Sequence, residues 1–182
     1  MTVRAHKPEF NFREKLKELD YAHVPYEKMP PGSVIQYVTK AYHSTSGTSS
    51  TSMTASGKKI TIYPKFHDSH IIVKFFATQY IRTTAGSRQT IRRNGSDFAR
   101  VFTEGGGSQG TVYTSLSQLG FYGSGNTGWY GQGVMMAIDV DHNTQGEALE
   151  YEVYLQAASG GTVYFPPGSV DHTFIEAYEV KQ

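Results

Sequence analysis

The segment Leu149-Glu150-Tyr151-Glu152-Val153-Tyr154-Leu155 carries the clearest structural signal in the sequence. Its apolar positions and Tyr151 alternate with two glutamates and Tyr154. A two-residue period is typical of a β-strand, because successive side chains point to opposite faces of a sheet. We therefore predict a strand over 149–155 that buries Tyr151, Val153 and Leu155 and turns Glu150 and Glu152 toward solvent.

The same period recurs along most of the chain. Asn94-Gly95 suits a hairpin turn, because both positions can take a positive φ. The Ser-, Thr- and Gly-rich stretch 44–56 is predicted to be a loop or a weak edge segment. The longest predicted strand, 70–80, places Ile71, Val73, Phe75 and Ala77 on one face, and a strand over 134–140 does the same with Val134, Met136, Ile138 and Val140. The other predicted strands cover 34–42, 60–63, 89–93, 98–102, 162–165 and 173–180. About eight or nine short strands, without a helical period after residue 32, favour an all-β antiparallel sandwich.

Composition excludes several classes of function. The 182 residues suit one domain with an extension, and 19 Gly, 13 Tyr and 10 Phe are typical of a β-rich chain with many turns. There is no Cys, so disulfide and thiol chemistry are excluded. The net charge of +1 lacks the basic excess that nucleic-acid binding needs. The apolar runs are far shorter than the roughly 20 residues that cross a bilayer, and the polar start MTVRAHKPEF is unlike a signal peptide. We expect neither nucleic acid nor membrane as a partner.

Residues 1–31 differ from the domain predicted over 32–182. Asn11 and Glu14 have the spacing of a capping box. Phe12, Leu16 and Leu19 then fall on one face of a helix of about two turns, which is too short to persist alone in water. Prolines at 25, 30 and 31 would stiffen the chain that follows. The pattern predicts a docking arm, whose stripe binds either a partner or the chain's own domain.

Three polar motifs suggest chemistry, and each has a simpler interpretation. Residues 123–128 fit G-x-G-x-x-G, but Trp129-Tyr130-Gly131 follow instead of a helix, so a flexible glycine loop explains them better than a nucleotide site. His67-Asp68-Ser69-His70 would converge on a metal only across a turn. Asp139, Asp141 and His142 carry side-chain atoms of the kind that bind cations, but such residues more often cap a loop by hydrogen-bonding its backbone. We therefore predict no cofactor and no metal.

Catalytic patterns are weak as well. No G-x-S-x-G nucleophile motif is present, and Glu150 with Glu152 is explained by a solvated strand face. We predict that the protein is not an enzyme, with a carbohydrate-active enzyme as the third choice among the functions considered below.

Aromatic residues are concentrated in the middle of the chain. Residues 115–133 are predicted to be a long ordered loop around a short strand. Aromatic side chains beside glycines can anchor an interface, bind sugar rings, or fill the edge of a sandwich. The residues concerned are Tyr113, Phe121, Tyr122, Trp129 and Tyr130.

Several segments follow one another in a characteristic order. They are Gly32-Ser33-Val34-Ile35-Gln36, 45–54, 60–73, Arg93-Asn94-Gly95, Phe98-Ala99-Arg100, Tyr151-Glu152-Val153-Tyr154-Leu155, Gly160-Gly161-Thr162-Val163-Tyr164 and Phe174-Ile175-Glu176-Ala177. Their order resembles a group of β-rich virion structural proteins of marine bacteriophages, called capsid-decoration, head-fibre or tail-fibre proteins. The resemblance covers nearly all of residues 32–180, and no single motif in it is diagnostic. A longer glycine-rich middle departs from the group. The leader 7–20 is similar to leaders of other phage structural proteins.

The resemblance implies a jelly-roll-like sandwich that forms a homotrimer on the virion surface, after synthesis in the host cytoplasm. The first expected function is a capsid decoration or cement protein, anchored by its arm to the major capsid protein or another virion protein. The alternative is a tail-fibre or receptor-binding protein that recognises a host surface glycan. The absence of a heptad run for a fibrous stalk favours the first.

Overall fold

The structure is a computed structural model that describes residues 25–82, 86–96, 113–115, 118–122, 129–157, 161–165 and 173–182. Within these ranges, the side chains of 77–88, 113–122 and 129–133 are outside the description. The chain divides into two units, Met1–Pro30 and Pro31–Gln182. The described part of the first unit holds one 3₁₀ turn, η1 (Tyr26–Lys28). The predicted helix with Phe12, Leu16 and Leu19 lies outside the described residues.

Eleven strands make up most of the described second unit, which is therefore all-β as predicted. Each strand pair is antiparallel. The strands are β1 (Val34–Tyr42), β2 (Ser46–Thr48), β3 (Thr54–Ile62), β4 (His70–Arg82), β5 (Gly86–Arg93), β6 (Tyr113–Ser115), β7 (Gln118–Tyr122), β8 (Trp129–Asp139), β9 (Leu149–Ala157), β10 (Thr162–Phe165) and β11 (Thr173–Val180).

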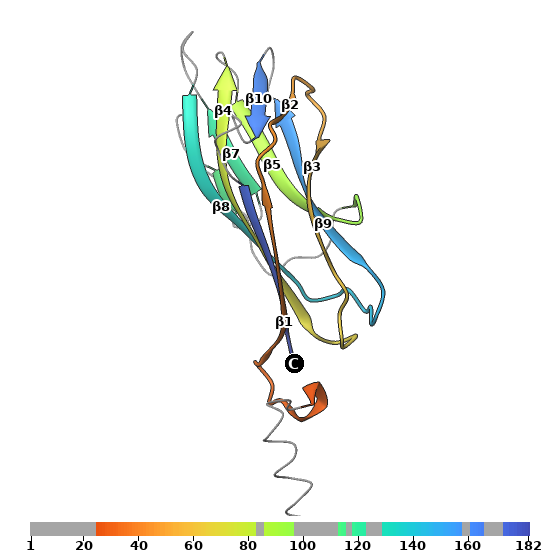
Figure 1. Ribbon diagram of the computed structural model, residues 1–182. Helices are drawn as coiled ribbons and strands as arrows, with labels where there is room; N and C mark the ends of the chain where they lie inside the picture. Colours follow the sequence, from red (N-terminus) through yellow and green to blue (C-terminus); the bar gives the residue numbers. More distant parts are fainter. Residues whose placement is uncertain are drawn as a thin grey trace, which may run out of the picture. The chain divides into compact units, whose positions relative to one another are not determined.

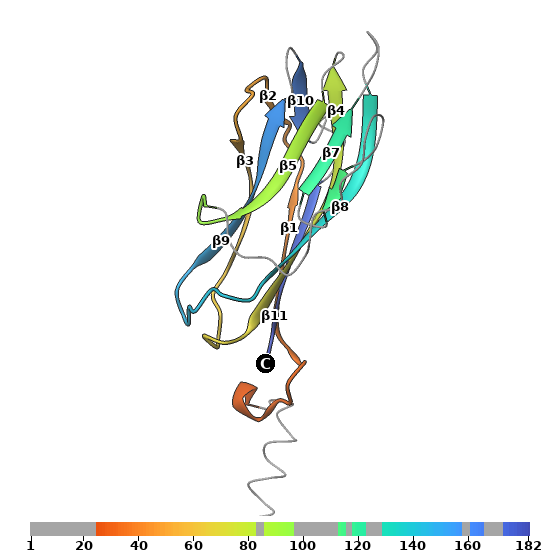
Figure 2. The same ribbon diagram turned by 180° about the vertical axis from the view of Figure 1, so that it is seen from behind.

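The strands form two sheets in two layers (Figures 1 and 2). The first sheet has the order β1-β11-β4-β10-β2, and β8 pairs with β4. β11 pairs with residues 70–76 of β4, and β10 pairs with residues 80–82. Along residues 70–76 of β4 the order of strands is therefore β1-β11-β4-β8. The second sheet has the order β3-β9-β5-β7-β6.

One hydrophobic core takes residues from both sheets. Tyr151, Val153 and Leu155 of β9 are buried in it, as predicted. Ile71, Val73 and Phe75 of β4 share one face, as predicted, and this face is fully buried opposite them. The remaining core residues are Ile60, Ile62, Ile91, Met135, Ala137, Leu149, Phe165, Ile175 and Ala177.

Val134, Met136 and Ile138 share one face of β8, as predicted, and this face is the outward one. Met135, Ala137 and Asp139 are buried, whereas Val134 is 48% exposed. Every residue from 134 to 138 is apolar, so both faces of the strand are apolar up to Asp139. Alternation alone therefore does not decide which face is inward. Asp139 points inward because it meets Arg93 and Tyr151 there, as described below.

Several predicted boundaries are confirmed, and others are wrong. Strands 34–42, 162–165 and 173–180 begin and end as predicted. Asn94 and Gly95 have φ angles of 48° and 79°, which confirms the turn, while 98–102 lies outside the described residues. The short strand predicted within 115–133 agrees with β7, but this segment also contains the first residues of β8. The segment 44–56, predicted to be a loop or a weak edge segment, contains the three-residue edge strand β2 and the start of the edge strand β3. Threonine and aromatic residues favour strands, but the glycines among them weakened the strand pattern in the sequence.

A bulge in β3 explains why this strand begins earlier than predicted. The register with β9 shifts between Ala55 and Lys59. Gly57 has a φ of +74° there, and its N–H donates to the buried Glu152 carboxylate at 2.7 Å. Glu152 therefore does not lie on a solvated face, although Glu150 is partly exposed as predicted.

Candidate interaction surface

The outward side of the β1-β11-β4-β8 arrangement is a sheet face with many apolar residues. Val34, Tyr37, Phe76, Val134 and Phe174 are between 37% and 52% exposed. We call this surface the outer apolar face. It consists of the outward side chains Val34, Tyr37, Thr39 and Ala41 of β1, Phe174, Glu176, Tyr178 and Val180 of β11, His70, Ile72, Lys74 and Phe76 of β4, and Val134, Met136 and Ile138 of β8.

Strand register arranges these side chains in rows across the sheet. Phe76 is opposite Val134 on one side and Phe174 on the other. Two residues further along β4, Lys74 is opposite Met136 and Glu176. The next row brings Ile72 between Ile138 and Tyr178, and Tyr178 opposite Tyr37. The charged row thus lies between two apolar ones.

Two tyrosines hold the carboxylate of this face. Tyr178 donates its hydroxyl to Glu176 Oε2 at 2.7 Å, and Tyr37 donates to Oε1 at 3.1 Å. The two rings lie 4.9 Å apart, and Lys74 Nζ lies 5.1 Å from the centre of the Tyr178 ring. The hydrogen bond to Glu176 raises the pKa of Tyr178 to about 12. The polar groups of the face are therefore held in place within the sheet.

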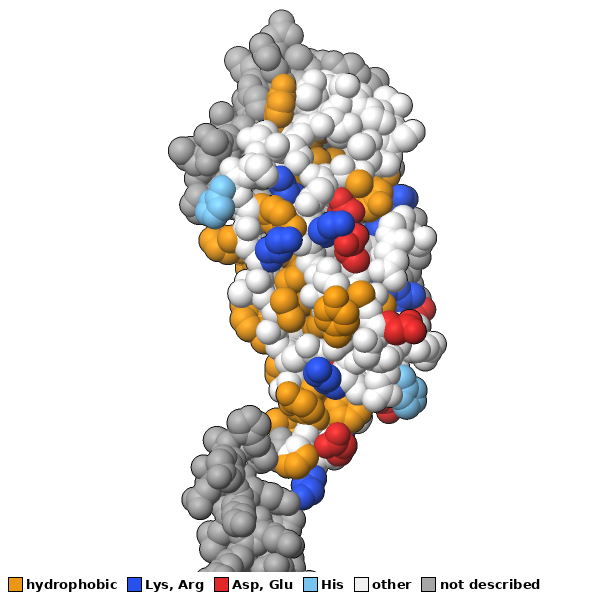
Figure 3. Space-filling view, turned by 45° about the vertical axis from the view of Figure 1, so that its right-hand side comes forward, with side chains coloured by type: hydrophobic (Ala, Val, Ile, Leu, Met, Phe, Trp, Pro, Cys, Tyr) orange, Lys and Arg blue, Asp and Glu red, His pale blue; other side chains and the backbone are white. Residues whose placement is uncertain are grey.

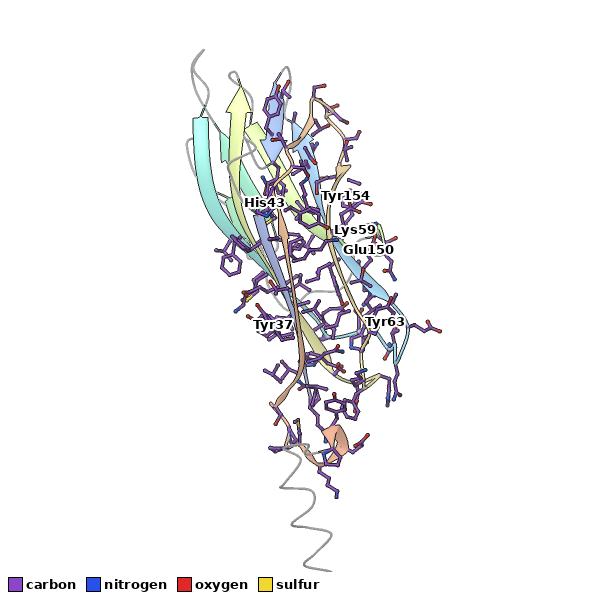
Figure 4. The ribbon with its side chains drawn as sticks, viewed as in Figure 1. Tyr37, His43, Lys59, Tyr63, Glu150 and Tyr154 are labelled. Carbon is purple, nitrogen blue, oxygen red and sulfur yellow. The ribbon has the colours of Figure 1, made fainter. Side chains whose placement is uncertain are left out.

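The outward side of β3, β9 and β5 is more polar. Lys59 Nζ forms an ion pair with Glu150 at 2.8 Å, and the guanidinium of Arg92 lies 4.7 Å from the centre of the Tyr154 ring. Figure 4 shows Lys59, Glu150 and Tyr154 close together on β3 and β9, with Tyr37 on the strand β1 and Tyr63 beyond the end of β3. In Figure 3, hydrophobic side chains reach the surface beside groups of Lys, Arg, Asp and Glu.

Asp139, Asp141 and His142, which the sequence groups together, are divided between two places. Arg93 Nη1 donates to both carboxylate oxygens of Asp139, at 2.7 and 2.8 Å, and to Asp141 at 3.1 Å. Tyr151 donates its hydroxyl to Asp139 at 2.6 Å, and burial, with the nearby Asp139 carboxylate, raises the pKa of Tyr151 far above its usual range. An arginine therefore neutralises these carboxylates, and the network ties β5, β8 and β9 together.

His142 lies instead beside Ser69 and the buried Glu179. Thr144 N–H donates to His142 Nδ1 at 3.1 Å, so Nε2 carries the proton and donates to the Ser69 carbonyl at 2.7 Å. The Ser69 hydroxyl lies 3.4 Å from this Nε2 and 2.8 Å from Glu179. Because Nε2 is already a donor, His142 does not accept the serine proton, and this trio is not a nucleophile with its base.

Glu179 is a buried carboxylate that the sequence analysis did not identify. It accepts hydrogen bonds from the backbone N–H groups of Lys65 and Phe66 at 2.8 to 3.0 Å, and from the Gln36 side chain at 2.6 Å. These donors join the β3–β4 connection to β11 and β1. The available signal was its position, since Glu179 shares the inward period of Ile175 and Ala177.

The other predicted sites have mixed outcomes. His67 and Asp68 lie in an exposed turn, and His70 begins β4. Across the described ranges, no group of three or more His, Asp or Glu side chains is placed to hold a metal ion. The glycine motif 123–128 lies outside the described residues. The five predicted aromatics lie on strands and not in a loop: Tyr113 on β6, Phe121 and Tyr122 on β7, and Trp129 and Tyr130 on β8.

The outer apolar face is the surface that the sequence analysis missed. Its signal is an apolar residue on both faces of one strand, as in Phe174-Ile175-Glu176-Ala177-Tyr178. No protein-family model and no curated protein matches the sequence. Among the helical residues that the structure describes, none belongs to a segment long and apolar enough to cross a membrane.

Proposed function

We propose that this chain is a non-enzymatic structural protein of a bacteriophage particle, a homotrimeric capsid decoration or cement protein. The observation that carries the proposal is the outer apolar face, with Tyr37, Phe76, Val134 and Phe174 exposed on a sheet. An exposed sheet face with this many apolar side chains is typical of a protein that assembles with others. The resemblance of the segment order to phage decoration and fibre proteins is the reason for proposing a phage particle as the assembly that this protein joins.

The strand orders support a jelly-roll-type sandwich for the visible domain. The four strands β1-β11-β4-β8 are matched by β3-β9-β5-β7 in the second sheet. Between β3 and β5, and again between β8 and β10, the chain changes sheet at each successive strand. Alternation of this kind builds the two Greek keys of a jelly roll, an architecture common in viral capsid proteins.

The proposed anchor is the N-terminal arm, whose stripe of Phe12, Leu16 and Leu19 contacts the shell. Burying each of these side chains contributes about 1.5 to 3 kcal/mol, and ordering the arm opposes most of that gain. One arm would bind weakly, but three arms on a trimer would raise avidity by about 10² to 10⁴. The domain over 32–182 would then stand outside the shell.

Attachment to particles tests this proposal. Particles stripped of the protein are mixed with the full chain, with a variant lacking residues 1–31, and with a Leu16→Asp, Leu19→Asp variant. We expect only the full chain to restore decoration in electron micrographs. Full occupancy by the truncated variant would show that the anchor is elsewhere, and a position on the tail in the intact virion would refute the capsid role.

The alternative is a tail-fibre or receptor-binding protein for a host glycan. The observation that favours it is the outward side of β3 and β9, where the Tyr154 ring lies near the Lys59–Glu150 pair (Figure 4). Sugar rings stack on aromatic faces and bind charged groups at their hydroxyls. Binding of host-cell polysaccharide that is lost in Tyr154→Ala and retained in Tyr63→Ala would support this alternative.

A further inference from the structure

We propose that copies of this chain associate through the outer apolar face, with the β4/β8 half of one copy against the β1/β11 half of the next. This inference deepens the homotrimer of the proposed function and rests on it for the number of copies. The occupant of the face is thus a second copy of the same domain.

The two halves of the face are chemically complementary. The β4/β8 half is aliphatic and aromatic around one cation, Lys74, and the β1/β11 half is aromatic around one anion, Glu176. Lys74 and Glu176 are in the same row of the face. When the β4/β8 half of one copy meets the β1/β11 half of the next, Lys74 of the first copy therefore lies opposite Glu176 of the second. Such pairing sets the register and excludes the like-charged arrangement.

Within one chain, neither charge is fully satisfied by the other. Glu176 accepts from Tyr178 and Tyr37, and Lys74 lies over the Tyr178 ring; among the described residues no ion pair joins Lys74 to a carboxylate within 4.0 Å. The tyrosine hydrogen bonds hold the Glu176 carboxylate in place before a partner arrives. Pre-positioned charges of this kind lose little conformational entropy on binding.

The size of the face fits repeated contacts of a closed ring. Strands lie about 4.8 Å apart and rows of outward side chains about 6.7 Å apart, so four strands and four rows give a footprint of about 500 Å². That area is near the upper end for apolar patches on monomers. In a three-fold ring each copy uses the whole face, so the ring buries about 1,500 Å² in all, or about 500 Å² at each of its three contacts. A single contact is thus smaller than a standard specific interface of about 1,600 Å², and only the closed ring brings the three contacts together.

Charge reversal in the full chain tests the contact, with the mass measured by sedimentation at micromolar concentration. We expect the wild type to be trimeric, and Lys74→Glu or Glu176→Lys to raise the dissociation constant at least about 100-fold, since like charges then meet. The double variant Lys74→Glu, Glu176→Lys restores both pairs and should restore the trimer. Lys59→Glu and Glu150→Lys, at the ion pair on the other sheet, are matched controls that should stay trimeric.

Each outcome separates this inference from the virion role. A monomeric wild type, or a trimer that both single reversals leave intact, would overturn the contact. A trimer lost on deleting residues 1–30 but unaffected by the reversals would show that the arm makes the contact instead. A trimer that behaves as expected but does not attach to particles would leave the inference standing and refute the virion role.

Discussion

The Tyr42 hydroxyl holds both backbone groups of Lys59. It donates to the Lys59 carbonyl at 2.6 Å and accepts from the Lys59 N–H at 3.0 Å. Tyr42 ends β1 of the first sheet, and Lys59 belongs to β3 at the edge of the second, so one side chain takes the place of a neighbouring strand. The ammonium groups of Lys40 and Lys58 lie 4.8 and 5.2 Å from the centre of its ring.

Removing the Tyr42 hydroxyl should destabilise the domain, because it removes the hydrogen bonds that join β1 of one sheet to β3 of the other. We expect Tyr42→Phe to lower the free energy of unfolding by about 1 to 2 kcal/mol, because two backbone groups lose a partner. The midpoint of urea unfolding measures the change. Tyr63→Phe is the control, since the Tyr63 ring is exposed and Gln36 bonds only its backbone carbonyl. An equal effect of the two substitutions would argue against the clamp.

The buried Asp139 depends on Arg93. Arg93→Met leaves a fully buried carboxylate without its cation, and we expect a loss of about 3 kcal/mol in the free energy of unfolding. The double variant Arg93→Met, Asp139→Asn removes the charge as well and should lose less than the single one. Unfolding in urea distinguishes the two, and a double variant that is the less stable would contradict this account.

Alkaline pH should destabilise the domain through its tyrosines. Tyr178 has a folded pKa of about 12 and an unfolded one of about 10, and the pKa of Tyr151 is raised in the same direction. The folded state therefore keeps protons that the unfolded chain loses above about pH 10, so this contribution is complete below pH 10 and is lost as the pH rises through the folded pKa. Urea midpoints should fall as the pH rises from about 10 to about 12, and Tyr178→Phe should flatten this dependence on pH. An unchanged slope in Tyr178→Phe would show that this tyrosine does not contribute to it.

The inward face of β9 should not tolerate a charge. Val153 is fully buried between the sheets, so Val153→Asp buries an unpaired carboxylate at a cost of several kcal/mol. We expect the variant to be insoluble, as measured by the soluble fraction after expression. Thr61→Lys places a charge on the outward side of β3 opposite Glu150 and should remain soluble.

Alternation predicted the strands whose two faces differ in polarity. In β9 the apolar positions are all inward, and the prediction was correct. In β8 alternation correctly placed Val134, Met136 and Ile138 on one face, but both faces are apolar and the pattern did not decide which is inward. Asp139 lies on the inward face, where it meets Arg93 and Tyr151. A local pattern carries no information about a partner 46 positions away in the chain, as for Arg93 and Asp139.

The candidate surface was outside the reach of sequence alone for a related reason. Its rows combine residues of β1, β4, β8 and β11, and the register between these strands is not written in any one of them. The excess of aromatic residues was visible, but it directed attention to Tyr113, Phe121 and Trp129 rather than to Tyr37 and Phe174. The stripe of Phe12, Leu16 and Leu19 stays a prediction.

The pairing of β1 with β11 has a consequence for synthesis. Gln36 and Glu179 bond each other across 143 positions, and within the described residues β11 is the only strand hydrogen-bonded to β1. At about 5 to 20 residues per second, a ribosome takes roughly 7 to 30 seconds to make that intervening chain. During this time β1 has no strand to pair with, and the nascent chain exposes β-prone apolar segments that can aggregate. Folding of this domain therefore depends on the chain staying soluble until its final strand has left the ribosome.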